Sequence, residues 1–202
     1  MGEAMTPLTV VDLPAERDTA AARLLADAFL NDPVWRATGP RWSPHRRLVS
    51  TVFHLGELKL ARREEAYILG ALEGEELHGV LVAYRCGRLP PGALSLASKA
   101  FAFSLAGPVA CLRAARMWSG LTRWHPTAPH IYGWLLATRP RDRGTGSLLL
   151  TEILSRPEVA RSPIYLEATH PDNARLYRRM GWEGLGQYRL RTGDTVFPMW
   201  RP

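Results

Sequence analysis

Cysteine is nearly absent from this sequence. Only Cys86 and Cys111 occur, and they do not form a C-x-x-C pair. A disulfide scaffold or a cysteine-bound zinc site needs more cysteines at characteristic spacings, so neither is expected. The first residues also lack the basic start and apolar core of a signal peptide, and we therefore expect a cytoplasmic protein.

Lysine is equally scarce. Lys59 and Lys99 are the two lysines among 26 basic residues, and the formal net charge is +7. The arginines are scattered, with local clusters at 139–143 and 175–179, and no polybasic tail or stacking aromatic motif accompanies them. These features favour an anionic cofactor as the partner and argue against nucleic acid.

A long apolar run free of charge is also missing. Residues 93–112 come nearest, but Lys99 lies inside this run and Pro108 interrupts it. A membrane-spanning helix needs about 20 mostly apolar residues with few charges. We therefore expect no membrane span, and extra helices around residues 93–121 that are buried or line a pocket.

The most informative motif is a glycine-rich turn. The apolar run His130–Thr138 predicts a buried strand, and Arg141-Asp142-Arg143-Gly144-Thr145-Gly146-Ser147 leads from it into a helical run. Amide groups at a helix N-terminus bind phosphate, and glycine lets a ligand approach the backbone. The string is neither a P-loop nor a dinucleotide fingerprint, since G-x-x-x-x-G-K-[ST] is absent and Leu149 replaces the third glycine.

A second motif follows. Residues 164–169 alternate like a strand, Pro171 suits the first turn of a helix, and Gly181 suits its C-terminal cap. This pattern predicts a short helix that carries Asn173 and Tyr177.

The remaining pattern predicts an α/β protein with a single domain over 1–202. We expect strands at 8–11, 67–72, 77–84, 188–191 and 195–200, and helices at 15–29 and 44–61. In the second helix Leu48, Val52, Leu55 and Leu58 share one side. The order of elements predicts a mixed sheet with helices on both faces.

At this point the chain resembles a known family. An apolar strand, R-x-x-G-x-G, a helix, a strand and N-x-x-L-Y-x-x-x-G-W, over about 130–182, are similar to the GNAT superfamily of acyl-CoA N-acyltransferases. Within it, Asp27-Ala28-Phe29, Asp32-Pro33, Tyr165-Leu166-Glu167 and Pro171-x-Asn173 resemble small-molecule acetyltransferases of the puromycin acetyltransferase type. The resemblance implies a mostly antiparallel sheet whose fourth and fifth strands splay apart.

One departure from the family pattern concerns the loop. Counted from Pro140, Leu148 stands where the family has Gly or Ala, whereas counted back from the helix Arg141, Gly144 and Gly146 fit R-x-x-G-x-G. The loop is therefore about two residues short, and the family's arginine position falls on Arg141 or Arg143.

The resemblance also implies a reaction: direct acetyl transfer from acetyl-CoA to an amine in a ternary complex. Tyr177 would be the general acid for the leaving thiolate, and Glu167 would accept the amine proton, unless it forms an ion pair with an arginine. Asp32, His78, His130 and His170 are weaker candidates for that base. The residues implied to hold the coenzyme are Leu136, Ala137, Thr138, Arg141, Arg143, Gly144, Thr145, Gly146, Ser147, Asn173 and Tyr177.

The acceptor is expected to be a small-molecule amine, and a homodimer stays open. Phe29, Trp35, Phe101, Phe103, Trp118 and Trp124 would line its pocket. The alternatives are a protein or peptide N-acetyltransferase and a non-catalytic acyl-CoA-binding module.

Overall fold

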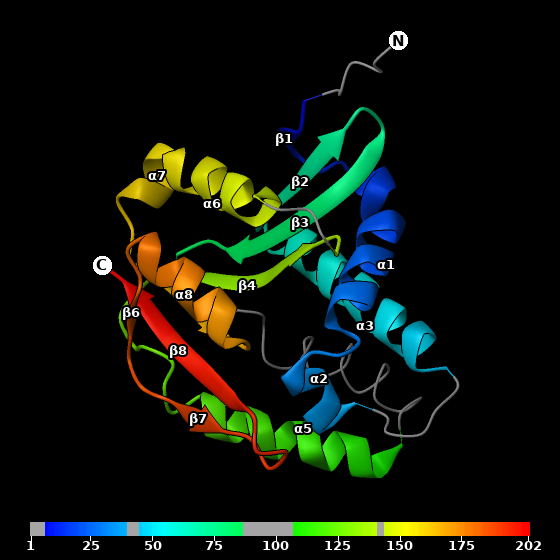
Figure 1. The fold of residues 1–202 in the computed structure, drawn as a ribbon, viewed down its shortest axis with the longest axis vertical. Coiled ribbons are helices and arrows are strands. Elements are labelled where there is room, and N and C mark those ends of the chain that lie inside the picture. The colour runs from blue at the N-terminus through cyan, green and yellow to red at the C-terminus, as the bar shows by residue number, and fades with distance from the viewer. Residues whose placement is uncertain (1–6, 40–44, 87–106, 141–143) are drawn as a thin grey trace.

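The computed structural model describes residues 7–39, 45–86, 107–140 and 144–202 (Figure 1). Eight strands of this described part form one sheet in the order β1-β2-β3-β4-β5-β8-β6, with β7 paired to β8. The strands are β1 (Thr9–Asp12), β2 (Tyr67–Glu73), β3 (Glu76–Tyr84), β4 (Ile131–Thr138), β5 (Ile164–Ala168), β6 (Glu183–Gly184), β7 (Tyr188–Arg189) and β8 (Thr195–Arg201).

The sheet is mostly antiparallel, as the family resemblance implies. Within the described residues, β4 and β5 are the parallel pair, and the other paired strands run antiparallel. β2 and β3, both predicted as strands, form a hairpin in which Gly74 has a φ of +57°. A positive φ suits glycine, which has no Cβ to clash.

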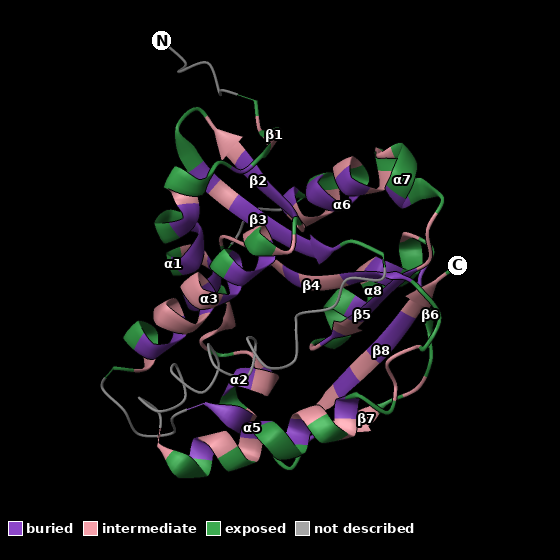
Figure 2. Ribbon diagram, turned by 180° about the vertical axis from the view of Figure 1, so that it is seen from behind, coloured by how far each residue is buried: buried purple, intermediate pink, exposed green. Residues whose placement is uncertain are grey.

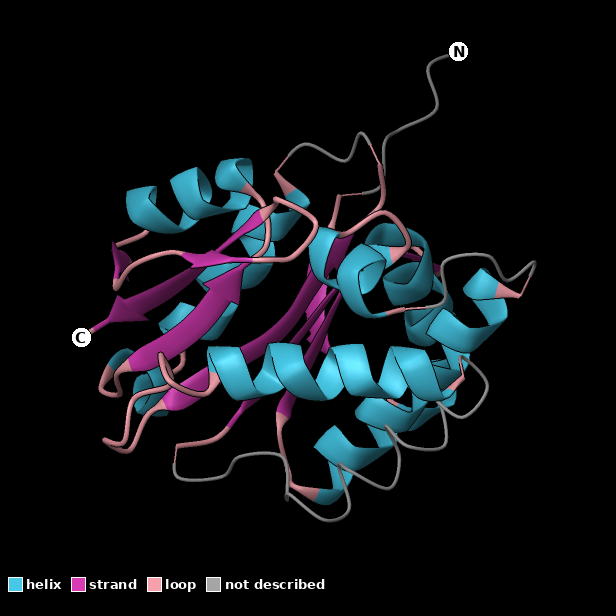
Figure 3. Ribbon diagram, turned by 90° about the horizontal axis from the view of Figure 1, so that it is seen from below, coloured by secondary structure: helices cyan, strands magenta, loops and turns pink. Residues whose placement is uncertain are grey.

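Helices cover both faces of the sheet (Figure 3). They are α1 (Asp18–Phe29), α2 (Pro33–Thr38), α3 (Arg46–Arg63), α5 (Pro108–Leu121), α6 (Thr145–Ser155), α7 (Pro157–Ala160) and α8 (Pro171–Arg179), with a 3₁₀ turn at Ala15–Arg17. The cluster around Leu149, Ile153 and Tyr177 fills one face, and the cluster around Leu25, Leu58 and Val80 fills the other. Figure 2 shows the central strands buried between these layers.

Helix α3 differs from its predicted face. Leu48 is 58% exposed, whereas Ser50, His54 and Glu57 are buried. The His54 ring stacks on Phe29, and Glu57 accepts a hydrogen bond of 2.9 Å from Trp134 Nε1. His54 and Ser50 contact each other within the helix, and Glu57 finds its partner on β4. A count of apolar residues does not reveal these contacts.

Helix α2 was not predicted. Asn31-Asp32-Pro33 ends α1 as expected, but Asp32 then caps the next helix by accepting hydrogen bonds from the amides of Val34 (2.8 Å) and Trp35 (3.4 Å). Pro33 occupies the first helical position, where the missing N–H costs nothing. The same three residues therefore stop one helix and start another.

Several other boundaries differ from the expectation. The predicted strand 188–191 is reduced to Tyr188–Arg189, because Leu190 to Gly193 form the turn into β8. The short elements β6 and α7 were missed. The expected extra helices are present as α5, while residues 93–106 of that prediction and Pro44 lie outside the described residues.

We find no helix in the described part of the chain with the length and apolar character needed to cross a bilayer.

Candidate active site

The central strands β4 and β5 separate partway along their length. β5 pairs with Ile131, Tyr132 and Gly133 of β4, but β4 continues to Thr138 with β3 as its neighbour. The predicted splay of the fourth and fifth strands is therefore confirmed. It leaves the β5 side of β4 open from Trp134 onward.

A β-bulge marks the point of separation. Ala83 of β3 pairs with Gly133 and Val82 pairs with Leu135, so Trp134 is an extra residue in β4. Bulges are common beside active sites because they redirect side chains and end regular pairing.

The N-terminus of α6 faces this opening. Gly144 caps the helix with a φ of +97°, and, within the part of the chain that the structure describes, no side-chain cap accepts a hydrogen bond from the first-turn amides. Those amides have no partner within the helix and carry the positive end of its dipole. Arg141 and Arg143, which the sequence also assigned to this loop, lie outside the described residues.

Thr145, which the family resemblance places among the coenzyme residues, packs against the sheet. The residue is 1% exposed and lies under β3, where a Cβ on Gly79 would come within 2.8 Å of the Thr145 methyl group. Helix α6 thus approaches the sheet closely at a glycine. The accessible residues at the start of α6 are its neighbours Gly144, Gly146 and Ser147.

An open cleft of about 860 Å³ brings most of the predicted coenzyme residues together. Its walls come from the end of β4, the start of α6 and one face of α8. The predicted residues that line it are Leu136, Ala137, Thr138, Gly144, Gly146, Ser147, Asn173 and Tyr177.

The cleft has the features that a long anionic cofactor needs. A Cβ added to Gly144 would meet no atom within 4 Å, and one added to Gly146 would meet only the Thr138 methyl group at 3.8 Å. The backbone at the helix start is therefore accessible, beside amides that favour negative charge. These residues fit a coenzyme diphosphate.

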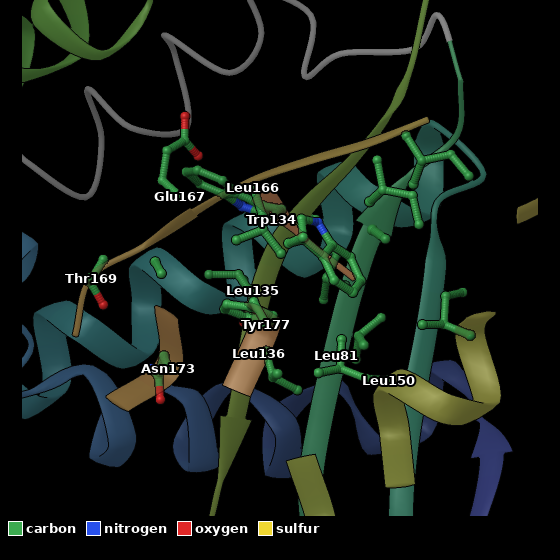
Figure 4. Close-up of a pocket in the computed structure, with 18 of the residues that line it drawn as sticks. Leu81, Trp134, Leu135, Leu136, Leu150, Leu166, Glu167, Thr169, Asn173 and Tyr177 are labelled. Carbon is green, nitrogen blue, oxygen red and sulfur yellow. The ribbon is translucent and has the colours of Figure 1, made fainter. Parts of the chain in front are cut away.

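Tyr177 lies on α8 between the cleft and the space that separates β4 from β5 (Figure 4). It is 8% exposed, and its ring packs against Trp182 with the ring centroids 5.6 Å apart. Burial raises the pKa of the Tyr177 hydroxyl above its usual value near 10. The phenol is therefore neutral at pH 7 and can donate a proton.

Glu167 lies on β5, where Tyr132 donates a hydrogen bond of 2.8 Å to its Oε2. Desolvation raises the pKa of this carboxyl to about 7, although the hydrogen bonds from tyrosine lower it in part. Among the described residues no arginine pairs with Glu167, so the ion-pair alternative finds no support there. A carboxylate with a pKa near 7 suits a general base.

Two smaller cavities meet the cleft. One lies between β4 and β5, and the other, of about 100 Å³, lies between α2, α3, α5 and β4. Phe29 and Thr169 line all three spaces. Glu167 lines both smaller cavities, so its carboxylate lies near the place where they join.

Asp32 also lies at this junction, where it lines the cleft and the cavity between α2, α3, α5 and β4. We call this second space the aromatic-sided cavity. It accepts a hydrogen bond from the Thr169 hydroxyl in addition to capping α2. Burial raises the pKa of Asp32, and these hydrogen bonds oppose that rise. The sequence named Asp32 as a weaker candidate for the base; an Asp-Pro pair after a helix was the available signal for its role as a helix cap.

The three histidines named with Asp32 lie in different places. His170 lines the cleft at the start of α8. His130 makes a 2.7 Å hydrogen bond to the Ala128 carbonyl and a 3.1 Å contact with His125. His78 lies near Glu73 and Glu76 at the β2–β3 turn. None of the three lines either smaller cavity.

The predicted aromatic pocket is confirmed in part. Phe29, Trp35 and Trp118 line the cavity of about 100 Å³. Trp124 does not, because its ring lies against Gly186 instead. Phe101 and Phe103 lie outside the described residues.

Comparisons with known proteins extend over nearly the whole chain. A structure described as histone acetyltransferase HPA2 and related acetyltransferase from Corynebacterium glutamicum is 27% identical, with 96% of each chain covered and a TM-score of 0.74. The C-terminal condensation domain of Ebony, bound to β-alanyl-dopamine, is 12% identical over 98% of this chain and 99% of that one, with a TM-score of 0.61. A polyamine N-acetyltransferase from Drosophila melanogaster is 15% identical over 96% and 99%, with a TM-score of 0.58.

No protein-family model matches the sequence, and no curated protein matches it significantly. The two structures below 20% identity establish the fold of this chain. The Corynebacterium structure adds sequence similarity over nearly the whole chain. The separated β4 and β5 strands, the glycine turn into α6 and these matches show that the chain has the GNAT fold.

Proposed function

We propose that this protein transfers the acetyl group of acetyl-CoA directly to the amine of a small molecule. The observation that carries the proposal is one shared opening. The separated strands, the uncapped start of α6, Tyr177 and the Glu167 carboxylate all border connected cavities. Acetyltransferases of the same fold are similar over almost the whole chain.

The backbone at the start of α6 would hold the coenzyme diphosphate, helped by the charges of Arg141 and Arg143 in the preceding loop. The amides of Gly146 and Ser147, which line the cleft in the first turn of α6, would suit a diphosphate. The open edge of β4 from Leu136 to Thr138 would hold the pantetheine arm, with Asn173 on the facing wall. When bound, the coenzyme supplies a thioester as the activated acyl group.

Glu167 would manage the proton of the acceptor. Its pKa of about 7 leaves a large fraction ionised at neutral pH. The carboxylate can therefore take a proton from the ammonium form of the acceptor, directly or through one water molecule. The deprotonated nitrogen then has the lone pair that acyl transfer requires.

Tyr177 would supply the complementary proton. Its hydroxyl, kept neutral by burial, can donate to the sulfur that leaves. Glu167 and Tyr177 both line the space between β4 and β5 (Figure 4). The base and the acid would thus act at the same opening without a covalent enzyme intermediate.

The test combines binding and turnover. Calorimetry with coenzyme A should give a measurable heat, and thiol release from acetyl-CoA should require an added small amine. Binding without turnover on any amine would favour an acyl-CoA-binding module, and turnover on peptides alone would favour a peptide acetyltransferase. Absence of coenzyme binding would refute the proposal.

A further inference from the structure

The aromatic-sided cavity has two chemically different ends. At the end shared with the other cavities lie Asp32, Glu167 and the Thr169 hydroxyl. Phe29, Trp134 and Leu135 line this cavity and the one between β4 and β5. The other lining residues belong to this cavity alone among the three and carry no carboxylate. They are Val34, Trp35, Thr38, Phe53, His54, Met117, Trp118, Leu121 and Val196.

Rings make up much of the far end. Trp118 of α5 packs against Trp134 of β4 with centroids 5.3 Å apart, and Trp35 of α2 packs against Phe53 of α3 at 5.6 Å. Helices α2 and α5 lie side by side below the separated strands (Figure 1), and both contribute side chains to this end. An aromatic ring can stack or pack edge-on within such walls.

Among the described residues, the polar groups of the far end add no charge. The Thr38 hydroxyl donates to the Val34 carbonyl at 2.8 Å. Nδ1 of His54 lies 2.7 Å from the Ser50 carbonyl, and the ring is fully buried with a pKa lowered to about 4. A neutral imidazole cannot balance or repel a cation as an ionised side chain would.

The size of the cavity sets a further limit. Its volume is about 100 Å³ and it opens toward the junction. An apolar cavity of roughly 150 Å³ is enough to bind benzene. One six-membered ring, with small side-chain adjustments, is therefore the largest rigid group that the far end suits.

We infer that the acceptor is a primary monoamine carrying one aromatic ring, with the ring among Trp35, Trp118 and Leu121 and the amino group at Asp32 and Glu167. This inference rests on the proposed acetyl transfer and specifies its substrate class. A diamine or polyamine would place its second ammonium in the uncharged end, where desolvation of an unpaired cation is costly. The site thus selects against acceptors with two cationic ends.

The first experiment compares acceptors by thiol release at saturating acetyl-CoA. Phenethylamine should exceed agmatine and spermidine in kcat/KM by about tenfold or more, because ring burial favours the former and desolvation disfavours the latter. Agmatine or spermidine reacting as well as phenethylamine would overturn the inference and leave acetyl transfer standing. No thiol release with any amine would overturn the proposed function instead.

In that second case the ring site is still testable. Phenethylamine should quench tryptophan fluorescence saturably, since Trp118 and Trp134 border the cavity, and spermidine at the same concentration should not. Equal quenching by the two amines, or none by phenethylamine, would overturn the inference independently of turnover.

A pair of variants on one helix tests the location. Leu121→Phe fills the cavity and should lower kcat/KM for phenethylamine about tenfold, with little effect on ethylamine. Leu112→Phe is the matched control, because Leu112 lies on α5, is 52% exposed and does not line the cavity. If Leu121→Phe fails to fold, Trp118→Ala should shift preference toward the bicyclic tryptamine. Unchanged selectivity in a folded cavity variant would overturn the inference.

Discussion

The hydroxyl of Tyr132 donates a 2.8 Å hydrogen bond to Oε2 of Glu167, across the last paired segment of β4 and β5. This bond fixes the carboxylate at the point where the two strands begin to part. It also stabilises the ionised form of Glu167, against the desolvation that raises the pKa of the group. The orientation of the base and its pKa thus depend on the same contact.

Removing that hydroxyl should change the pH dependence of the reaction. In Tyr132→Phe the carboxylate loses a hydrogen bond, so the pKa of Glu167 rises above about 7. Because the ionised form is the base, kcat/KM should fall at pH 7, and its midpoint should move to higher pH by roughly half to one unit. Rates measured from pH 5.5 to 9.5 check this.

Tyr67→Phe is the matched control for that shift. Tyr67 also donates from a strand to a glutamate, at 3.2 Å to Glu158, but this pair lies outside the catalytic opening. Its pH profile should equal that of the parent protein. A Tyr132→Phe profile that also stays unchanged would remove Glu167 as the titrating base.

Replacing Tyr177 separates an acid from a packing residue. Tyr177→Phe keeps the contact with Trp182 and removes only the hydroxyl, so kcat should fall by roughly 10²-fold or more with little change in coenzyme A affinity. Tyr84→Phe is a suitable control, because Tyr84 is a buried tyrosine that does not line the cleft. Equal kcat for the parent and Tyr177→Phe would contradict the acid role.

Two glycines with similar backbone angles test the phosphate site. Gly144 and Gly193 have φ values of +97° and +92°, and a Cβ on either would meet no atom within 4 Å. Alanine at either position should cost on the order of 1–2 kcal/mol of stability through the left-handed backbone. Only Gly144→Ala should raise KM for acetyl-CoA, by about tenfold, since Gly193 does not line the cleft. Parallel increases in KM would show an effect of stability alone.

The buried His54 predicts a loss of stability in acid. Its pKa falls from 6.5 to about 4 on folding, so the unfolded chain binds the extra proton first. Above pH 6.5 the His54 ring is neutral in both states and does not reduce the free energy of unfolding. As the pH falls from 6.5 toward 4, the unfolded state is protonated and the free energy of unfolding decreases. Between pH 7 and pH 5 the parent should lose on the order of 2 kcal/mol more than His54→Phe. Urea unfolding at both pH values measures this, and equal losses would contradict it.

Much of the fold could be predicted from periodicity and turn residues. The β2–β3 hairpin, β4 and the helix carrying Tyr177 follow from alternation, glycines and Pro171. The short elements α2, α7 and β6 could not, since two to six residues show too little periodicity. The exposure of Leu48 was missed because the buried face of α3 depends on His54 and Glu57 finding partners on distant elements.

The candidate site was predictable where a linear motif encodes it. The start of α6 and the position of Tyr177 follow from R-x-x-G-x-G and the second motif. The junction of the cavities was not predictable, because Asp32 and Thr169 are 137 residues apart. The fold alone brings them together, and a single sequence carries no signal of that contact.

The bulge at Trp134 has a consequence for engineering. An ordinary strand alternates its side chains between the two faces of the sheet, but the extra residue puts Trp134 and Leu135 in succession against the layer that holds α1 and α3. Leu136 then packs in the opposite layer, toward α6. Deleting one residue here would shorten the strand, and it would also move each side chain up to Thr138 to the opposite face of the sheet. Redesign of acceptor choice is therefore better directed to α5, where side chains can be varied without changing the phase of β4.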